Sequence, residues 1–135
     1  MATTPWRPCS VRPFNQIELS PLQLQALTDG TLEQSLDLGL QPMVWSPLAG
    51  GRLFTGHDEQ ERRVREILDA LAQSHGVSAA TVAYAWILRH PSRPRPITGS
   101  ARIEAVAEAV SALSLRLPAE DWYRVWRAST GRDVA

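Results

Sequence analysis

Hydrophobic and polar positions divide the chain into short apolar runs and longer stretches of helical period. In the longer stretches apolar side chains recur every three or four residues, which places them on one face of a helix. Short runs bounded by proline or glycine are typical of strands. The pattern predicts strands over residues 14–19, 42–46 and 95–98, and helices over 31–38, 59–74, 79–90, 102–113 and from Pro118 onward.

Several predicted helices carry end signals in the sequence. Asp29 or Thr31 can cap the first helix, and Gly39 suits the left-handed position that follows a helix end. Gly76 ends the second helix and Ser78 caps the third. These signals fix the helix ends locally, without reference to the rest of the fold.

The order of the predicted elements indicates an α/β fold. Strands that alternate with helices favour a parallel sheet with right-handed crossovers. The unbroken apolar run at 42–46 is typical of a strand buried on both faces. Three strands leave two unpaired edges, so the pattern favours part of a larger α/β fold. Residues 1–13, with three prolines, are expected to be an irregular leader, and residues 14–135 the folded part.

Composition excludes some classes of function. Fourteen basic residues, all arginine, balance fourteen acidic ones, so the net charge is zero and nothing favours nucleic-acid or membrane binding. The absence of lysine removes lysine-dependent chemistry. The one cysteine, Cys9, cannot form an internal disulfide, and no apolar stretch suits a signal peptide or a membrane span. We therefore expect a cytoplasmic protein.

One alternative is a DNA-binding helix-turn-helix over residues 71–82, where glycine lies between two helices. A recognition helix presents polar and basic side chains to the bases. The second helix here begins with Ala79, Ala80 and Thr81, and its arginine comes late, at position 89. The neutral charge also disfavours this alternative.

Three segments carry a family resemblance. They are Asn15–Glu18 with Ser20-Pro21, Trp45–Leu48 with Gly50–Leu53, and Pro96–Ser100 with Arg102 and Glu108. In this order and spacing they resemble the ends of the sixth, seventh and eighth strands of aldo-keto reductases. That family is a (β/α)₈ TIM barrel with its site at the carboxyl ends of the strands. The resemblance implies a partial barrel, made of about the last three βα units and a C-terminal helix.

The resemblance implies a binding face for NADP(H). Gln16 corresponds to the glutamine whose amide bonds the nicotinamide carboxamide, and Trp45 to the aromatic residue that stacks on the nicotinamide ring. Ser46 and Leu48 lie where the family's loop lines the pyrophosphate. The two glycines that follow would keep this loop slim.

The last segment corresponds to the family's phosphate and adenine contacts. Gly99, Ser100 and Arg102 fall near a predicted helix start, which favours a phosphate, and Arg102 can reach the additional phosphate of NADP. Glu108 matches a residue that bonds the adenine. Two positions depart from the pattern: Ala109 stands where many members have asparagine, and Gly99 where some have lysine.

Each of these residues also has a purely structural interpretation. Gln16 can be a polar strand-end residue, and Trp45 a core residue. Ser100 can be a helix cap, and Arg102 and Glu108 solvated helix residues. The remaining tryptophans of the predicted helices are assigned to packing: Trp86, Trp122 and Trp126.

The family's catalytic group does not match this sequence. The resemblance implies a tyrosine that donates a proton, a lysine and an aspartate that tune it, and a histidine, all from the first half of the barrel. Here lysine is absent, and the tyrosines, Tyr84 and Tyr123, lie in predicted helices. We therefore expect a truncated or split aldo-keto reductase that does not reduce carbonyls alone. A companion chain with the first barrel units, a non-catalytic NADP-binding module and a self-associating module remain alternatives.

Overall fold

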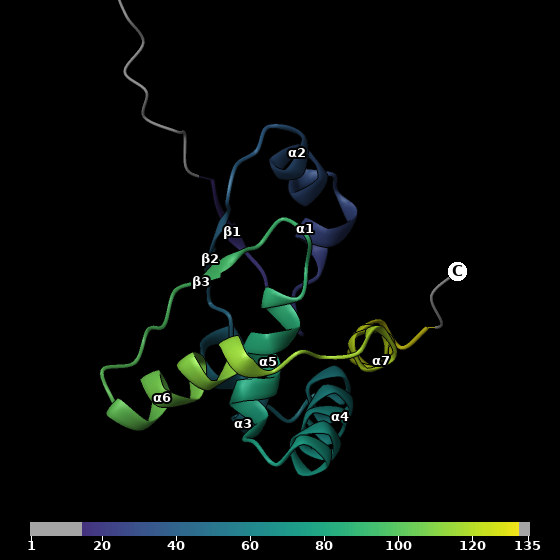
Figure 1. The fold of residues 1–135 in the computed structure, drawn as a ribbon. Helices are drawn as coiled ribbons and strands as arrows, with labels where there is room; N and C mark the ends of the chain where they lie inside the picture. The colour runs from purple at the N-terminus through teal and green to yellow at the C-terminus, as the bar shows by residue number, and fades with distance from the viewer. Residues whose placement is uncertain (1–14, 133–135) are drawn as a thin grey trace, which may run out of the picture.

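The computed structural model describes residues 15–132, which form an α/β fold around a parallel sheet (Figure 1). The strands are β1 (Gln16–Glu18), β2 (Met43–Trp45) and β3 (Arg95–Pro96), and they lie in the order β1-β2-β3. Both pairs are parallel, which confirms the sheet type expected from the sequence. The expected leader, residues 1–13, lies outside the described residues.

All three strands are shorter than the apolar runs that predicted them. Backbone bonds of 2.8 Å join Met43 N to Asn15 O and Ile97 N to Val44 O. Beyond Trp45 the backbone of Ser46 turns to a positive φ of 50°, so the chain leaves the sheet there. Sequence hydrophobicity overestimates the strands because it does not reveal where the backbone turns away.

The five predicted helices are present, with ends shifted by a few residues. They are α2 (Thr31–Asp37), α4 (Glu59–His75), α5 (Ala79–Leu88), α6 (Ile103–Ser111) and α7 (Ala119–Thr130). Two one-turn helices, α1 (Gln25–Thr28) and α3 (Arg52–Thr55), were not predicted, because one turn is too short to show a period. Turns of 3₁₀ helix occupy Ala49–Gly51 and Ala112–Ser114. Among the described residues, no helix has the length and apolar character needed to cross a membrane.

The local end signals of α4 and α5 act as the sequence predicts, whereas neither Asp29 nor Thr31 is the cap residue of α2. The Ser78 hydroxyl accepts the Thr81 N–H at 3.1 Å at the start of α5. Gly76 ends α4 with a left-handed φ of 67°. Asp29 accepts the Thr31 N–H at 2.9 Å, although Gly30 is the residue at the cap position of α2. Each signal involves groups within three residues, which is why sequence alone identifies it.

The core lies on one side of the sheet, with α5 at its centre. Residues 81–87 of α5 are all buried, and α5 packs against α4 and α6. A helix buried in this way cannot enter a DNA groove, so the helix-turn-helix alternative has no exposed recognition helix. Buried apolar residues from the strands, the other helices and the connecting loops complete this core: Ile17, Leu19, Leu32, Val44, Leu53, Val64, Leu68, Leu71, Leu117 and Val125.

Two tryptophans join α5 to α7. Trp86 Nε1 donates to Trp122 O at 3.1 Å, and Trp122 Nε1 donates to Trp86 O at 2.9 Å. Their rings stack with centroids 5.2 Å apart, and Trp126 lies 5.4 Å from the Trp122 ring. The packing role predicted for these tryptophans is confirmed.

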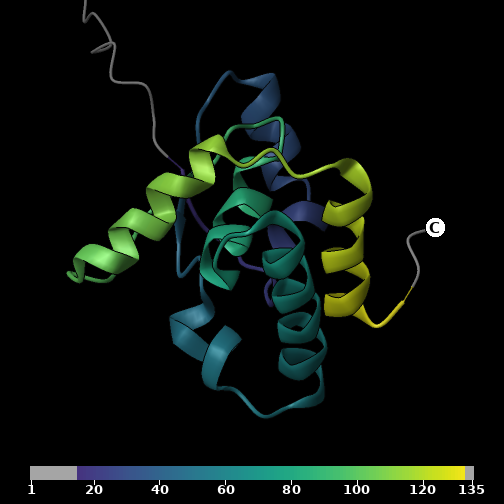
Figure 2. The same ribbon diagram turned by 60° about the horizontal axis from the view of Figure 1, so that its bottom comes forward.

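Helix α6 projects from the body of the molecule (Figure 2). An exposed apolar row, which we call the α6 stripe, is formed by three residues of α6 and one of the 3₁₀ turn that follows it: Ile103, Val106, Val110 and Leu113. Their side chains are 82%, 43%, 58% and 73% exposed, and α6 itself has no buried residue. An apolar row of this kind suits contact with further protein.

Candidate functional site

The candidate site begins on one face of the sheet. Side chains alternate along a strand, and laterally paired residues share a face. Gln16 pairs with Met43 and Glu18 with Trp45, so these four side chains lie on the same face. The alternate positions point into the core: Ile17 and Val44.

Trp45 is exposed rather than buried. Its side chain is 45% exposed, whereas its neighbour Val44 is 0% exposed. Strand β2 is therefore buried on one face only, and the expectation of a strand buried on both faces is wrong for the described residues. The apolar run did not reveal that Trp45 is exposed and Val44 is buried, because tryptophan counts as apolar on either face of a strand. An exposed indole at the carboxyl end of a parallel strand suits a flat ligand.

Glu18 and Met43 also lie on this face, although the sequence did not point to them as candidate site residues. Their place beside Trp45 and Gln16 follows from the strand register. A period of two from Gln16 already puts Glu18 on the same face. Met43 needed the register, which is a tertiary quantity.

The loop after β2 contains a run of left-handed backbone. Ser46 has φ 50° and Ala49 φ 54°, both uncommon for residues other than glycine. Gly50 and Gly51 follow with φ 63° and 90°, and a Cβ at either would meet no atom within 4 Å. Glycine is thus required there by backbone conformation, and the space beside it is open. Strained backbone of this kind concentrates at functional sites.

Leu48 lies in this loop with its side chain turned toward the core. Its side chain is half-buried and packs against the core. Its carbonyl accepts the Gly51 N–H at 3.0 Å, which helps to close the turn. Leu48 therefore anchors the loop, and its side chain is not turned out as a ligand surface.

The segment after β3 leads to the start of α6, at the end of the sheet to which the strands point (Figure 1). Helix α6 begins at Ile103, and Arg102 is its cap residue, exposed to solvent. The Ser100 hydroxyl accepts the Arg102 N–H at 3.2 Å. Gly99 and Ser100 thus precede the helix and do not belong to its first turn. The backbone N–H groups that face outward at this helix start belong to the residues after Arg102.

Glu108 is tied to the fold and is not simply solvated. The Ser78 hydroxyl donates to its carboxylate at 2.9 Å, and the Thr81 hydroxyl donates to its backbone oxygen at 2.9 Å. These bonds join the middle of α6 to the start of α5. Glu108 is therefore half-exposed and also bonded to α5, and any ligand at Glu108 would share the carboxylate with Ser78.

Tyr84 and His90, which lie outside this site, have shifted pKa values. Burial, and secondly the charge of Glu108, raises the pKa of Tyr84, so its phenol is held protonated inside α5. Burial lowers the pKa of His90, whose Nδ1 accepts the Ser92 N–H at 3.1 Å. Within residues 15–132 no group of His, Cys, Asp and Glu side chains is arranged to hold a metal ion.

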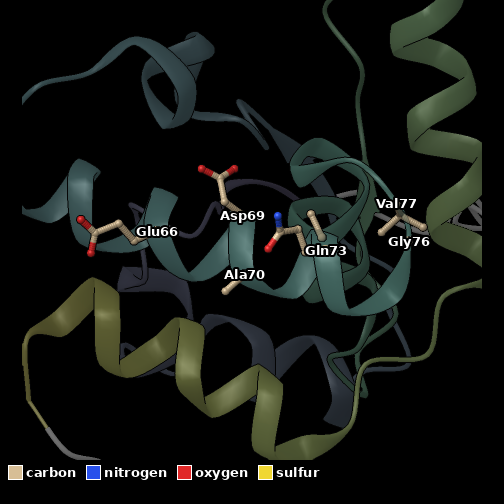
Figure 3. Close-up of a pocket in the computed structure, with 7 residues that line it drawn as sticks. Glu66, Asp69, Ala70, Gln73, Gly76 and Val77 are labelled. Atoms are coloured by element: carbon tan, nitrogen blue, oxygen red, sulfur yellow. The ribbon is translucent and has the colours of Figure 1, made fainter.

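A hollow of about 810 Å³ lies elsewhere, along α4 and the turn to α5 (Figure 3). Glu66, Asp69 and Gln73 line it, with Gly76 at the turn. It shares no residue with the open sheet face. Its carboxylates would repel a phosphate-bearing ligand, so it does not match the cofactor expected from the sequence.

The residues at the open face fit a dinucleotide. Trp45 offers a flat apolar surface, and Gln16 offers an amide on the same face. The loop from Ser46 to Gly51 has open space beside its glycines. Arg102 supplies an exposed cation at a helix start. A nicotinamide dinucleotide has a flat ring, a carboxamide and anionic phosphates. The indole, the amide and the arginine are the protein groups that complement them.

Comparison with known proteins agrees with this geometry. The sequence profile described as the Aldo/keto reductase family matches residues 13–129. The chain is 43% identical over 116 residues to 6-dehydroglucose reductase of Novosphingobium aromaticivorans, covering 86% of this chain and 38% of that protein. It is 44% identical over 121 residues to oxidoreductase YdhF of Escherichia coli, covering 89% and 40% respectively.

Solved structures give the same result. An aldo-keto reductase from Klebsiella pneumoniae in complex with NADPH matches with a TM-score of 0.69 and 28% identity, over 84% of this chain and 38% of that one. A thermostable aldo-keto reductase in complex with epalrestat matches in fold, with a TM-score of 0.71 and 23% identity, over 90% of this chain and 41% of that one. The chain thus spans about 40% of the length of the proteins it matches. It belongs to the aldo/keto reductase family.

Proposed function

We propose that this chain forms the cofactor-binding part of an NADPH-dependent aldo-keto reductase barrel, made of its last three βα units and a final helix. The observation that carries the proposal is the exposed Trp45 on the same sheet face as Gln16. A buried tryptophan would have ended this interpretation. The bound dinucleotide would supply hydride for the reduction of an aldehyde or ketone.

The described residues have distinct tasks in this proposal. Trp45 supports one face of the nicotinamide ring, and the Gln16 amide fixes the rotation of the ring by bonding its carboxamide. Ser46 and the backbone of the left-handed loop lie along the pyrophosphate. Ser100 and Arg102 approach the phosphate of the adenosine end, and Glu108 the adenine.

Catalysis requires groups that this sequence does not offer. A tyrosine made acidic by a neighbouring lysine is the proton donor that the family resemblance implies, but the sequence contains no lysine. Tyr84 is buried and its pKa is raised, which is opposite to the requirement of a proton donor. We expect the isolated chain to bind NADPH and not to reduce carbonyls.

The unsatisfied surfaces favour completion by the rest of a barrel. Strands β1 and β3 are the edges of the sheet, and the α6 stripe follows β3 along the chain. A βα unit whose strand pairs with β3 would bring its helix beside α6. The same unit would then cover both the free edge of β3 and the α6 stripe. The occupant we propose is therefore the barrel segment that precedes β1 in the family, in the same polypeptide or in a companion chain.

A second candidate is self-association through the same surfaces. The α6 stripe is exposed enough for two copies to pack together. This version predicts a molecular mass that rises with protein concentration in sedimentation. A mass that stays at 14.9 kDa across concentrations would argue against it.

The decisive experiment is a titration of the purified chain with NADPH, followed by tryptophan fluorescence. We expect saturable quenching that Trp45→Ala removes. Trp126→Phe is the matched control, because Trp126 lies in α7, where its ring contacts that of Trp122, and does not belong to the sheet. An absence of saturable quenching in a chain that circular dichroism shows to be folded would refute cofactor binding by this chain.

A further inference from the structure

Glu61 is a buried carboxylate with no part in the proposed binding contacts. It lies in the first turn of α4, where charged side chains normally face water, yet it is 5% exposed. Its Oε2 accepts the Asp58 N–H at 3.1 Å, and Asp58 in turn accepts the Glu61 N–H at 2.7 Å. This reciprocal pair caps α4. Capping alone does not require burial, so the position of Glu61 needs a further reason.

We call residues 46–51, the left-handed loop after β2, the cofactor loop. The reason for the burial of Glu61 lies in the segment between this loop and α4. Gly56 packs so closely on the Glu61 carboxylate that a Cβ at this position would overlap it. The φ of Gly56 is −71°, so glycine is required by space and not by conformation. The Arg65 guanidinium donates to Gly56 O at 2.8 Å from the next turn of α4. The carboxylate thus fills the bend that joins α3 to α4.

Glu61 is also connected to the left-handed loop itself. Arg52 Nη1 lies 3.6 Å from Glu61 Oε1, and Arg52 Nε donates to Ala49 O at 3.4 Å. The Thr55 hydroxyl donates to Gly51 O at 3.1 Å. Contacts therefore run from α4 through α3 to Ala49 and Gly51, two of the four residues in this loop with positive φ.

The two interactions of the carboxylate differ in strength. The side chain of Arg52 is 62% exposed, and an ion pair of 3.6 Å in that setting contributes little. The bond from the Asp58 N–H ends at a buried carboxylate, and loss of that acceptor would break the capping pair and leave the Asp58 N–H without its partner. The hydrogen bond therefore matters more than the charge. A glutamine, which keeps an acceptor oxygen, should replace Glu61 with small effect.

We propose that Glu61 is a positioning residue for the cofactor loop. It acts on the loop indirectly, through its contacts with Asp58, Gly56 and Arg52. It touches no cofactor atom. It holds the segment of residues 46–58 in the conformation that receives the pyrophosphate, so this inference rests on the proposed function.

The test measures amide hydrogen exchange of residues 49–58 and the NADPH Kd on the full chain. Glu61→Ala is expected to speed exchange of these amides and to raise the Kd roughly tenfold, because the Asp58 N–H loses its acceptor and the space that the carboxylate fills against Gly56 is emptied. Glu61→Gln should restore both values to within about twofold of wild type. Gly56→Ala, whose Cβ would overlap the Glu61 carboxylate and also crowd the backbone oxygen of Arg52, should resemble Glu61→Ala and serves in its place if that variant does not fold.

Glu59→Ala is the matched control. Glu59 belongs to the same helical turn, is 75% exposed and pairs with Arg63 at 3.0 Å, away from the loop. It should leave the Kd and the loop exchange unchanged. A wild-type chain that binds NADPH while Glu61→Ala and Gly56→Ala bind equally well overturns this inference and leaves the proposed function intact. An equal loss in Glu59→Ala also overturns it, and a wild-type chain that binds no NADPH overturns both.

Discussion

Replacing the two most exposed residues of the α6 stripe should barely change the stability of this chain. Ile103 is 82% exposed and Leu113 is 73% exposed. Full burial of such side chains contributes about 1.5–3 kcal/mol each. The buried fractions here, about a fifth and a quarter, scale to a combined contribution of about 1 kcal/mol. The double variant Ile103→Ser, Leu113→Ser should therefore lose about 1 kcal/mol of unfolding free energy or less.

The assay is urea unfolding followed by circular dichroism, with free energies from linear extrapolation. Leu117→Ala is the control, since Leu117 is 1% exposed and its truncation should cost about 2–5 kcal/mol. A loss above about 2 kcal/mol in the double serine variant, at unchanged denaturant slope, would show that the stripe is packed and would refute the reasoning.

The same variant separates the two occupants proposed for the stripe. If copies of the chain associate through it, the serine variant should remain at the monomer mass at concentrations where the wild type does not. If the stripe receives a barrel segment, the variant should weaken binding of that segment while its own stability stays the same. In both cases the difference arises from apolar area that is exposed in the chain and buried in the complex.

Three further predictions follow from individual contacts. Trp86→Phe removes the indole donor to Trp122 O and should cost about 2 kcal/mol in urea unfolding, from the lost bond and the smaller ring; an unchanged midpoint would contradict the reciprocal bonds. Gly99→Lys should tighten NADPH several-fold and leave NADH unchanged in parallel titrations, because a Cβ there meets no atom and the added cation favours the additional phosphate; equal gains for both dinucleotides would contradict that placement. Burial lowers the pKa of His90, so the unfolded chain binds its proton more readily and stability falls as the pH drops below 6.5. His90→Asn, which keeps an acceptor for the Ser92 N–H, should flatten the pH dependence of unfolding between pH 5 and 7, and a slope equal to that of the wild type would contradict the assignment.

Much of the secondary structure could be predicted because its signals are local. The capping serine of α5 and the glycine that ends α4 act on groups within a few residues, so the sequence alone identifies both ends. The alternation of strands and helices also sufficed for a parallel sheet. Strand lengths were overestimated, and α1 and α3 were not predicted, since one turn of helix carries no measurable period.

Only part of the candidate site, too, could be predicted from the sequence. The sequence determined which residue types stand at the strand ends, and it determined that no lysine is present for the family's catalytic group. It did not determine that Trp45 is exposed, that Leu48 is an anchor, or that Glu108 is bonded to Ser78. Those facts depend on contacts between segments far apart in the chain.

Glu61 shows the physical reason for this limit. By itself the sequence determined an acidic first turn of α4, in which both Glu59 and Glu61 are expected to face solvent. The tertiary structure leaves Glu59 exposed and buries Glu61 beneath Gly56 and Arg52. Hydrophobic period and capping act over one or two turns, whereas burial depends on which distant segment lies above a side chain. The tertiary structure alone therefore decided which of the two carboxylates supports the cofactor loop.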